Sequence, residues 1–285
     1  MRNKFSIIFS AFVLSLLLVS CKSKETGPPN ILILFADDLG FSDPGCYGGE
    51  ILTPSLDQLA ASGLRYTQFY NTARCWPSRA ALLTGYYPHQ TGRDNAPGIK
   101  GGSQMERTAW AQVAPSYLED AGYRSYHSGK WHVDGMPVEN GFDLSYWLPD
   151  HNRFFSPQRH YLNDALLEAV PRGTDYYSTT EIASRAITQL KEHKEKFDDR
   201  PFFSYVAFTT PHFPLHAPAE DIARVGDRYA TGWDRMRDER WKRIQELGIA
   251  SGQLSPVEAE VGPPYHFPES LEILGEKEVN LSLIH

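Results

Sequence analysis

Four short segments of the sequence carry side chains that can ligate a metal ion, bind an anion or transfer a proton. Each one follows a run of residues that is predicted to form a β-strand. In a parallel α/β sheet, the positions just beyond the carboxyl ends of strands converge in one crevice. The sequence therefore predicts a single site built from Asp37 and Asp38, from Cys75, from Lys130 and His132, and from His212.

Asp37 and Asp38 are neighbouring carboxylates at the end of the apolar run from Asn30 to Ala36. Adjacent carboxylates in such a place repel each other, and a hard divalent cation such as calcium or magnesium relieves that repulsion. Taken alone, the pair is also a common way to begin a helix. Metal binding is therefore a hypothesis that depends on the other three segments.

The histidines and the lysine also have simpler interpretations when each is taken singly. Lys130 or His132 alone would be a solvated side chain, and His212 alone would be a core histidine with satisfied hydrogen bonds. We expect that structural role for His127 and His216.

Apolar runs predict the strands that position these residues. The run from Asn30 to Ala36 suits a strand that is buried on both faces. Alternation predicts a strand from Leu64 to Tyr70, shortly before Cys75. A short strand is also expected from Tyr123 to His127, and an apolar run predicts a final strand from Phe202 to Phe208.

Helices are predicted between the strands. Thr53 and Pro54 begin one that ends at Gly63, and Pro77 opens another that ends at Gly85. A third is expected around residues 114–121, and residues 178–181 have the pattern of a capping box that opens a fourth. This alternation predicts an α/β fold with a largely parallel central sheet and helices on both faces.

The composition is that of a globular protein. The 285 residues are 41% hydrophobic and 22% charged, which argues against disorder. The formal net charge of −7 gives no reason to expect nucleic acid as a partner. An anionic substrate would need a positive site inside an acidic protein.

The N-terminus is predicted to be an export signal. Arg2 and Lys4 precede an apolar run that is too short for an ordinary membrane span, and Leu18 to Cys21 resembles the bacterial lipobox, with Cys21 acylated. An ordinary cleaved secretory signal is the alternative. We expect a signal peptide over residues 1–20, a tether over 21–29 and one catalytic domain over 30–285. The protein is then lipid-anchored in the cell envelope, periplasmic or outer-membrane-associated.

Three motifs place the chain in a known family by resemblance. Cys75-Trp76-Pro77-Ser78-Arg79, Gly129-Lys130-Trp131-His132 and Thr210-Pro211-His212 resemble the motifs of the sulfatases, bacterial arylsulfatase-like enzymes of the alkaline-phosphatase-like superfamily. The resemblance runs from Asn30 to about Pro218 and covers the N-terminal catalytic portion. It implies the sulfatase fold, with the C-terminal subdomain absent.

The resemblance also implies a role for each residue. Cys75 would be oxidised to formylglycine by a maturation enzyme and would contact the metal, which would be one calcium ion rather than magnesium, held by Asp37 and Asp38. Arg79 would steady the hydrated aldehyde. The remaining residues would act on the sulfate and on protons: Lys130 would hold sulfate oxygens, His132 would take a proton as the aldehyde re-forms, and His212 would assist the leaving oxygen.

The implied activity is hydrolysis of sulfate esters, on a small aryl sulfate or a sulfated glycan. Alternatives are a phosphodiesterase or phosphonate hydrolase of the same superfamily, and a non-catalytic lipoprotein that binds sulfated glycans. The family completes its metal site with a later Asp-Asn pair and a further Lys, whereas Asp94-Asn95 comes too early and is expected to form a turn. A disulfide between Cys46 and Cys75 is the structural alternative to a reactive Cys75.

Overall fold

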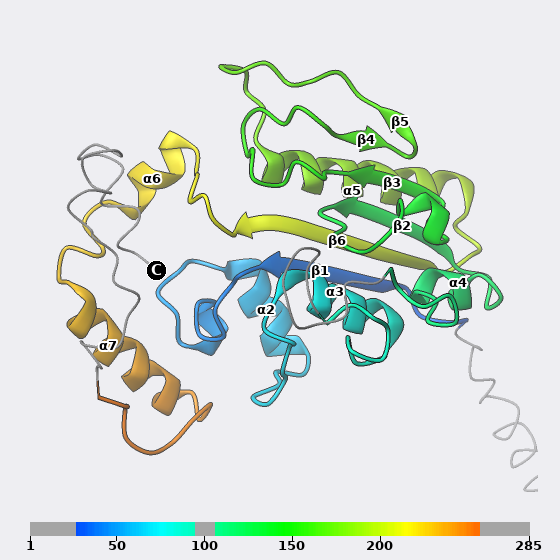
Figure 1. The fold of residues 1–285 in the computed structure, drawn as a ribbon. Coiled ribbons are helices and arrows are strands. Elements are labelled where there is room, and N and C mark those ends of the chain that lie inside the picture. The colour runs from blue at the N-terminus through cyan, green and yellow to red at the C-terminus, as the bar shows by residue number, and fades with distance from the viewer. Residues whose placement is uncertain (1–26, 95–105, 257–285) are drawn as a thin grey trace, which may run out of the picture.

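The computed structural model describes residues 27–94 and 106–256, which form one mixed sheet with helices around it (Figure 1). The strand order is β1-β6-β2-β3-β4-β5, in which β1, β6, β2 and β3 run parallel while β4 and β5 are antiparallel. The strands are β1 (Ile31–Asp37), β2 (Arg124–Gly129), β3 (Leu144–Trp147), β4 (Tyr161–Leu162), β5 (Ala165–Leu166) and β6 (Phe202–Pro211).

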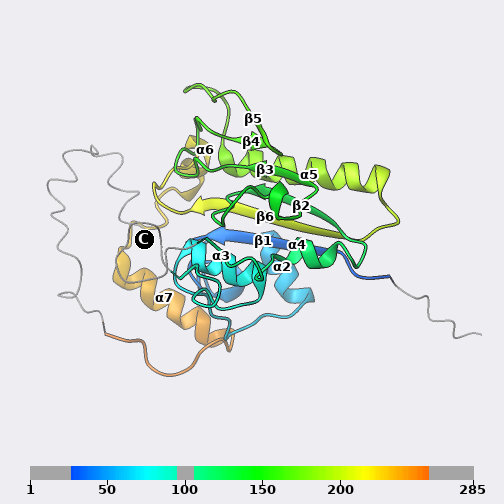
Figure 2. The same ribbon diagram turned by 45° about the vertical axis from the view of Figure 1, so that its right-hand side comes forward.

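α-Helices lie between β1 and β2 and between β3 and β6, as the alternation of the sequence predicts, whereas β2 and β3 are joined through a short 3₁₀ turn. The α-helices are α2 (Pro54–Ser62), α3 (Cys75–Thr84), α4 (Ala114–Leu118), α5 (Ser178–Lys196), α6 (Ala219–Val225) and α7 (Trp233–Glu246), and two short 3₁₀ turns are η1 (Gly45–Tyr47) and η2 (Val138–Asn140). The first helix-containing excursion follows β1, and the last one follows β6 and ends in α7 (Figures 1 and 2).

The central strand β6 has a separate core on each of its faces. Phe203 and Tyr205 belong to one apolar cluster, which also contains Leu83 of α3. Val206, which lies between Tyr205 and Ala207 of the first cluster, belongs to a second cluster with Ile182 of α5. Because successive strand residues point to opposite faces, α3 and α5 cover opposite faces of the sheet. The predicted α/β fold with helices on both faces is confirmed.

The strand predicted from Leu64 to Tyr70 is wrong, because this segment has no strand pairing. Its alternating apolar side chains do not enter a core. Leu64 is 84% exposed, and Phe69 and Tyr70 are also exposed. Alternation gives a strand only where one face is buried against a neighbour. Cys75 is therefore positioned by the start of α3 and not by the end of a strand.

The predicted capping box at the start of α5 is also not formed. Tyr177 is the N-cap, and no side-chain cap bond is made. The Ser178 hydroxyl instead lies 3.2 Å from that of Thr209, and Glu181 pairs with Arg185 at 2.7 Å. Ser178 and Glu181 therefore bond to Thr209 and Arg185 and not to the backbone amides at the start of the helix.

The predicted signal peptide, the lipid-bearing Cys21 and most of the tether lie outside the described residues. Within residues 27–94 and 106–256, no helix is both long and apolar enough to cross a bilayer. Cys46 and Cys75 are both free thiols, so the structure contains no disulfide between them.

His127 of β2 is a fully buried core histidine, as expected, whereas His216 is exposed, so the same expectation for it is wrong. Nδ1 of His127 lies 2.8 Å from the hydroxyl of Ser145 on β3. Burial lowers the pKa of His127 to about 3, against an ordinary value of 6.5.

This depressed pKa predicts acid-sensitive stability. As the pH falls below 6.5, the unfolded chain binds a proton at His127 before the folded chain does. The free energy of unfolding then falls by up to about 1.4 kcal/mol per pH unit from this residue. Urea unfolding between pH 7 and pH 5 checks this: the free energy of unfolding of His127→Gln should fall less steeply with falling pH than that of wild type. Replacing the exposed His89 in the same way is the control, and parallel curves for wild type and His127→Gln would contradict the assignment.

Candidate active site

A buried ion cluster lies at the carboxyl ends of β1 and β2. Asp37, the last residue of β1, pairs through Oδ1 with Arg79 Nη2 at 3.1 Å and through Oδ2 with Lys130 Nζ at 2.6 Å. All three side chains are at most 2% exposed. Three of the predicted site residues are thus in direct contact.

Electrostatics hold this cluster in its charged form. Burial alone would raise the pKa of Asp37, but the charges of Arg79 and Lys130 outweigh that effect and keep the pKa below its ordinary value. Two cations against one carboxylate leave a net positive charge inside an acidic protein. The locally positive site that an anionic substrate requires is therefore present.

The backbone at the end of β2 fixes Lys130. Gly129 has a φ of 117°, and a Cβ atom at this position would lie only 2.0 Å from the carbonyl oxygen of Ala207. The Lys130 amide donates to that same carbonyl at 2.9 Å, and the Lys130 carbonyl accepts from Arg79 Nη1 at 2.8 Å. The close approach of β2 to β6 therefore requires glycine next to the lysine.

Asp38 and His212 form a second contact on the exposed side of the cluster. His212 follows β6 directly, and its Nε2 lies 3.7 Å from Asp38 Oδ2. Its Nδ1 donates to the carbonyl of Phe213. Asp38 is 60% exposed at its side chain and has a left-handed φ of 64°. The parallel pairing of β1 with β6 brings these two segments side by side.

Cys75 enters the site as the first residue of α3. Arg79 lies one turn later in that helix, which links the cysteine to the ion cluster. The neighbouring Trp76 meets the ring of His132 edge-on, with ring centroids 5.7 Å apart. Arg79 Nε, Trp76 Nε1 and His132 Nδ1 are buried without a hydrogen-bond partner among the described residues. Two of these polar atoms belong to α3 itself, and the third belongs to the ring that packs against Trp76.

His132 and His151 adjoin each other beyond Lys130, with ring centroids 5.2 Å apart. Burial, reinforced by the nearby Lys130 charge, lowers the pKa of His132 to about 3 and that of His151 to about 4. Both rings are therefore neutral at pH 7. The His151 ring also meets that of His212, at 6.0 Å, so it lies between the two predicted histidines.

His151 was not among the residues expected from the sequence. It lies just after β3, which is the fourth parallel strand of the sheet and was not recognised from its short sequence Leu-Ser-Tyr-Trp. The rule that sites form beyond the carboxyl ends of parallel strands would have selected it, had β3 been predicted. A short strand in a region rich in aromatic residues gives only a weak periodic signal.

The two aspartates fit a hard cation only in part. Their carboxylate oxygens are the correct type of ligand for calcium. However, both oxygens of Asp37 already accept from Arg79 or Lys130. Among residues 27–94 and 106–256, no group of three or more His, Cys, Asp or Glu side chains is arranged to hold a metal ion. Asp94 is described but Asn95 is not, so the expected turn at this pair lies partly outside the described residues.

Comparison with known proteins gives a consistent match. The family model described as Sulfatase matches residues 29–261, a range that contains every site residue named above. The arylsulfatase of Klebsiella aerogenes is 31% identical over 246 residues, which cover 78% of this chain and 51% of that protein. The chain spans about half the length of the curated relatives it matches.

Two solved structures share the fold. Ps i-CgsB in complex with k-i-k-neocarrahexaose matches with a TM-score of 0.59 and 26% identity, covering 78% of this chain and 56% of that one. BT4656 in complex with its substrate D-glucosamine-2-N,6-O-disulfate matches with a TM-score of 0.58 and 26% identity, covering 70% and 38%.

The ion cluster predicts that replacing Asp37 destabilises the protein far more than replacing Asp38 does. Asp37→Asn leaves two buried cations without their counter-ion and should cost about 3–5 kcal/mol of unfolding free energy. Asp38→Asn, at an exposed position, should change it by less than about 0.5 kcal/mol. Urea unfolding of the two variants checks this, and equal effects would mean that Arg79 and Lys130 have other partners.

Proposed function

This chain belongs to the sulfatase family, and we propose that it hydrolyses sulfate esters at the cluster built around Asp37 and Cys75. The observation that carries the proposal is the buried, net positive ion cluster next to Cys75 at the start of α3. Charge develops on sulfate oxygens during ester cleavage, and fixed cations in a water-poor site stabilise it.

Cys75 is proposed as the precursor of formylglycine. When oxidised and hydrated, this residue supplies a carbon with two hydroxyls, one for attack on sulfur and one whose deprotonation releases sulfate. Arg79 supports this role, because its Nε is buried without a partner on the same helix, one turn after Cys75. A helix start also favours negative charge at residue 75.

The other side chains divide the remaining work. Lys130 would bind sulfate oxygens through its ammonium group, which Asp37 holds in place at 2.6 Å. His132 is neutral at pH 7, because burial lowers its pKa to about 3. Such a low pKa makes the ring a weak base, so taking a proton as the aldehyde re-forms requires the charge of a bound sulfate to raise that pKa. His212, next to Asp38, would protonate the leaving oxygen.

Asp37 and Asp38 would hold calcium together with the group derived from Cys75. The ion would add positive charge against the sulfate oxygens. Because Asp37 is already paired with two cations, and the part of the chain that the structure describes holds no group of three or more metal-ligating side chains, we assign no further step to the metal.

The substrate class is proposed to be a sulfated sugar. Ps i-CgsB was solved in complex with k-i-k-neocarrahexaose, and BT4656 in complex with D-glucosamine-2-N,6-O-disulfate. His151 supports the same class here. Its Nδ1 donates to the Pro149 carbonyl at 2.9 Å, so the Nε2 of the neutral ring is an acceptor. A sulfate offers only acceptors, whereas a sugar hydroxyl can donate to Nε2.

Substitution of the cysteine tests the reaction. After expression with a formylglycine-generating enzyme, peptide mass spectrometry should find an aldehyde at residue 75, and Cys75→Ala should abolish release of sulfate from an aryl sulfate. Cys46→Ala, which removes the other described thiol, is the matched control and should retain activity. An active protein with an unmodified thiol, or faster cleavage of a phosphodiester than of the sulfate ester, would refute this proposal.

Substitution of His151 tests the substrate class. His151→Ala should lower kcat/KM for a sulfated monosaccharide about tenfold, because a hydrogen bond to a sugar hydroxyl is lost. Its kcat/KM for an aryl sulfate without hydroxyls should stay within about twofold of wild type. His89→Ala should change neither value. An equal loss on both substrates would instead assign His151 to sulfate binding or to the fold.

A further inference from the structure

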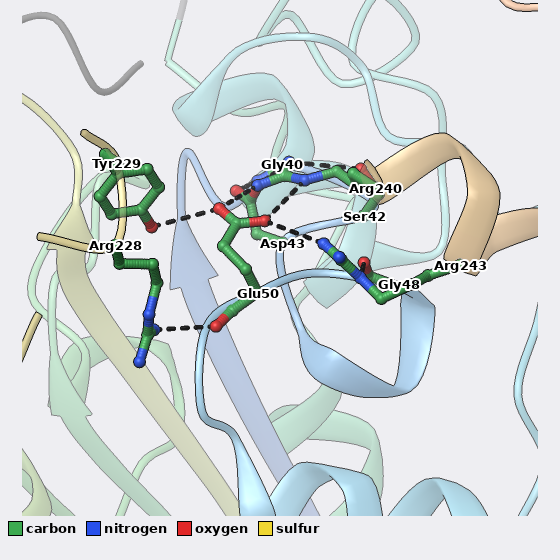
Figure 3. Close-up of polar contacts among 9 residues, drawn as sticks. All are labelled: Gly40, Ser42, Asp43, Gly48, Glu50, Arg228, Tyr229, Arg240 and Arg243. Atoms are coloured by element: carbon green, nitrogen blue, oxygen red, sulfur yellow. Dashed lines mark hydrogen bonds and ion pairs between the residues drawn. The ribbon is translucent and has the colours of Figure 1, made fainter. Parts of the chain in front are cut away.

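Glu50 lies at the centre of a cluster of polar contacts beside the sheet (Figure 3). Its carboxylate forms a bidentate pair with Arg240, in which Nη2 donates to Oε1 at 2.6 Å and Nε donates to Oε2 at 3.0 Å. The Tyr229 hydroxyl donates to Oε1 at 3.1 Å, and Arg228 donates to the Glu50 carbonyl at 2.8 Å. Arg243 Nη2 lies 3.7 Å from Oε2. The Glu50 side chain thus engages three others, and its backbone carbonyl engages a fourth.

This cluster joins two excursions of the chain that leave the sheet from neighbouring strands. Glu50 belongs to the segment that follows β1, while Arg240 is on α7, which is reached from β6 through α6. β1 and β6 are paired in parallel, so both excursions begin at the same end of the sheet. There Asp38 and His212 lie 3.7 Å apart. The two excursions therefore meet at Asp38 and His212 and again at Glu50 and Arg240.

Hydrogen bonds connect Arg240 back to the residues that follow Asp38. Arg240 Nη1 pairs with Asp43 Oδ1 at 2.7 Å, and Asp43 Oδ2 accepts from the Gly40 amide at 2.7 Å. The Asp43 amide donates to the Gly40 carbonyl at 3.1 Å. The turn from Gly40 to Asp43 is closed on itself and attached to α7. It begins two residues after Asp38, whose left-handed backbone persists only where its surroundings hold it.

Other ion pairs on α7 differ from this one. Arg235 pairs with Glu239 one turn along the same helix at 2.8 Å, and Lys242 lies 4.0 Å from Glu246. These side chains are mostly exposed and connect α7 only to itself. The side chain of Glu50, in contrast, is 11% exposed, and its ion pair spans 190 residues of sequence.

We propose that Glu50 and Arg240 are positioning residues, whose ion pair, extended through Asp43, fixes the turn that holds Asp38 opposite His212. The inference rests on the proposed function only in taking Asp38 and His212 as residues of the active site. The side chains of Glu50 and Arg240 act through Asp43 and the Gly40 turn, without a contact of their own to the ion cluster.

Hydrogen exchange of the full-length chain tests the connection directly. In Glu50→Gln, the amides of residues 38–43 should exchange about tenfold faster, because the turn opens locally, while those of β6 stay protected. Arg235→Gln, which breaks an exposed pair on the same helix, should leave residues 38–43 unchanged. If Glu50→Gln does not fold, Arg240→Lys keeps the charge and removes the fork that reaches Asp43. Unchanged exchange of residues 38–43 in either folded variant would overturn the inference.

Kinetics separate positioning from stabilisation. Well below the melting temperature, Glu50→Gln should lower kcat for an aryl sulfate about tenfold with a smaller change in KM, because misplaced groups slow the chemical step. A pair that only stabilises the fold would lower Tm and leave kcat unchanged, and that result would overturn the inference even if exchange became faster. If the unsubstituted chain releases no sulfate, the proposed function fails, whereas the exchange result still decides the connection between Glu50 and the Asp38 turn.

Discussion

The pairing of Asp37 with Arg79 and Lys130 is the interaction on which the rest of the site depends. Three ionised side chains share a nearly dry volume, and each comes from a different element: the end of β1, the helix α3 and the end of β2. None of them could be buried alone, since an unpaired charge in such surroundings is very costly. Satisfying Asp37 therefore requires that α3 and β2 meet the end of β1 at one point. That requirement also brings the start of α3, with Cys75, to the same place.

Around the ion cluster, two excursions of the chain, one after β1 and one after β6, leave the sheet at the same end. The parallel pairing of β1 and β6 sets their starting points, and the Glu50 cluster joins them again at a distance. The ordinary α/β rule explains why reactive groups gather at the strand ends. It does not explain how the exposed Asp38 and the half-buried His212 keep their relative placement. The long-range contacts between α7 and the segment after β1 supply that missing constraint.

Much of the site followed from the sequence, because three of its four segments come directly after strands that the sequence predicts, two of them from strongly apolar runs. The runs that form β1, β2 and β6 were recognisable, and so were the residues that follow them. However, β1 is not buried on both faces as expected, since Leu32 is 49% and Leu34 48% exposed. The strand expected from Leu64 to Tyr70 was wrong, since alternation alone cannot tell whether a face is covered. His151 was missed because β3 is only four residues long. The Glu50–Arg240 pair could not be predicted, because nothing local relates residues that far apart.

Gly129 illustrates how fold and chemistry share one short motif. Its backbone approaches Ala207 so closely that any side chain would collide, and Trp131, two residues later, is a core residue with 1% exposure. Lys130 and His132 alternate with these two. In the motif Gly-Lys-Trp-His, Lys130 and His132 therefore carry the chemistry. Gly129 is required by the close approach of β2 to β6, and Trp131 is required by the core. In a library of variants selected only for folding, Gly129 should be retained as strictly as a nucleophile is retained in a library selected for activity. The reason for its retention would be backbone geometry and not chemistry.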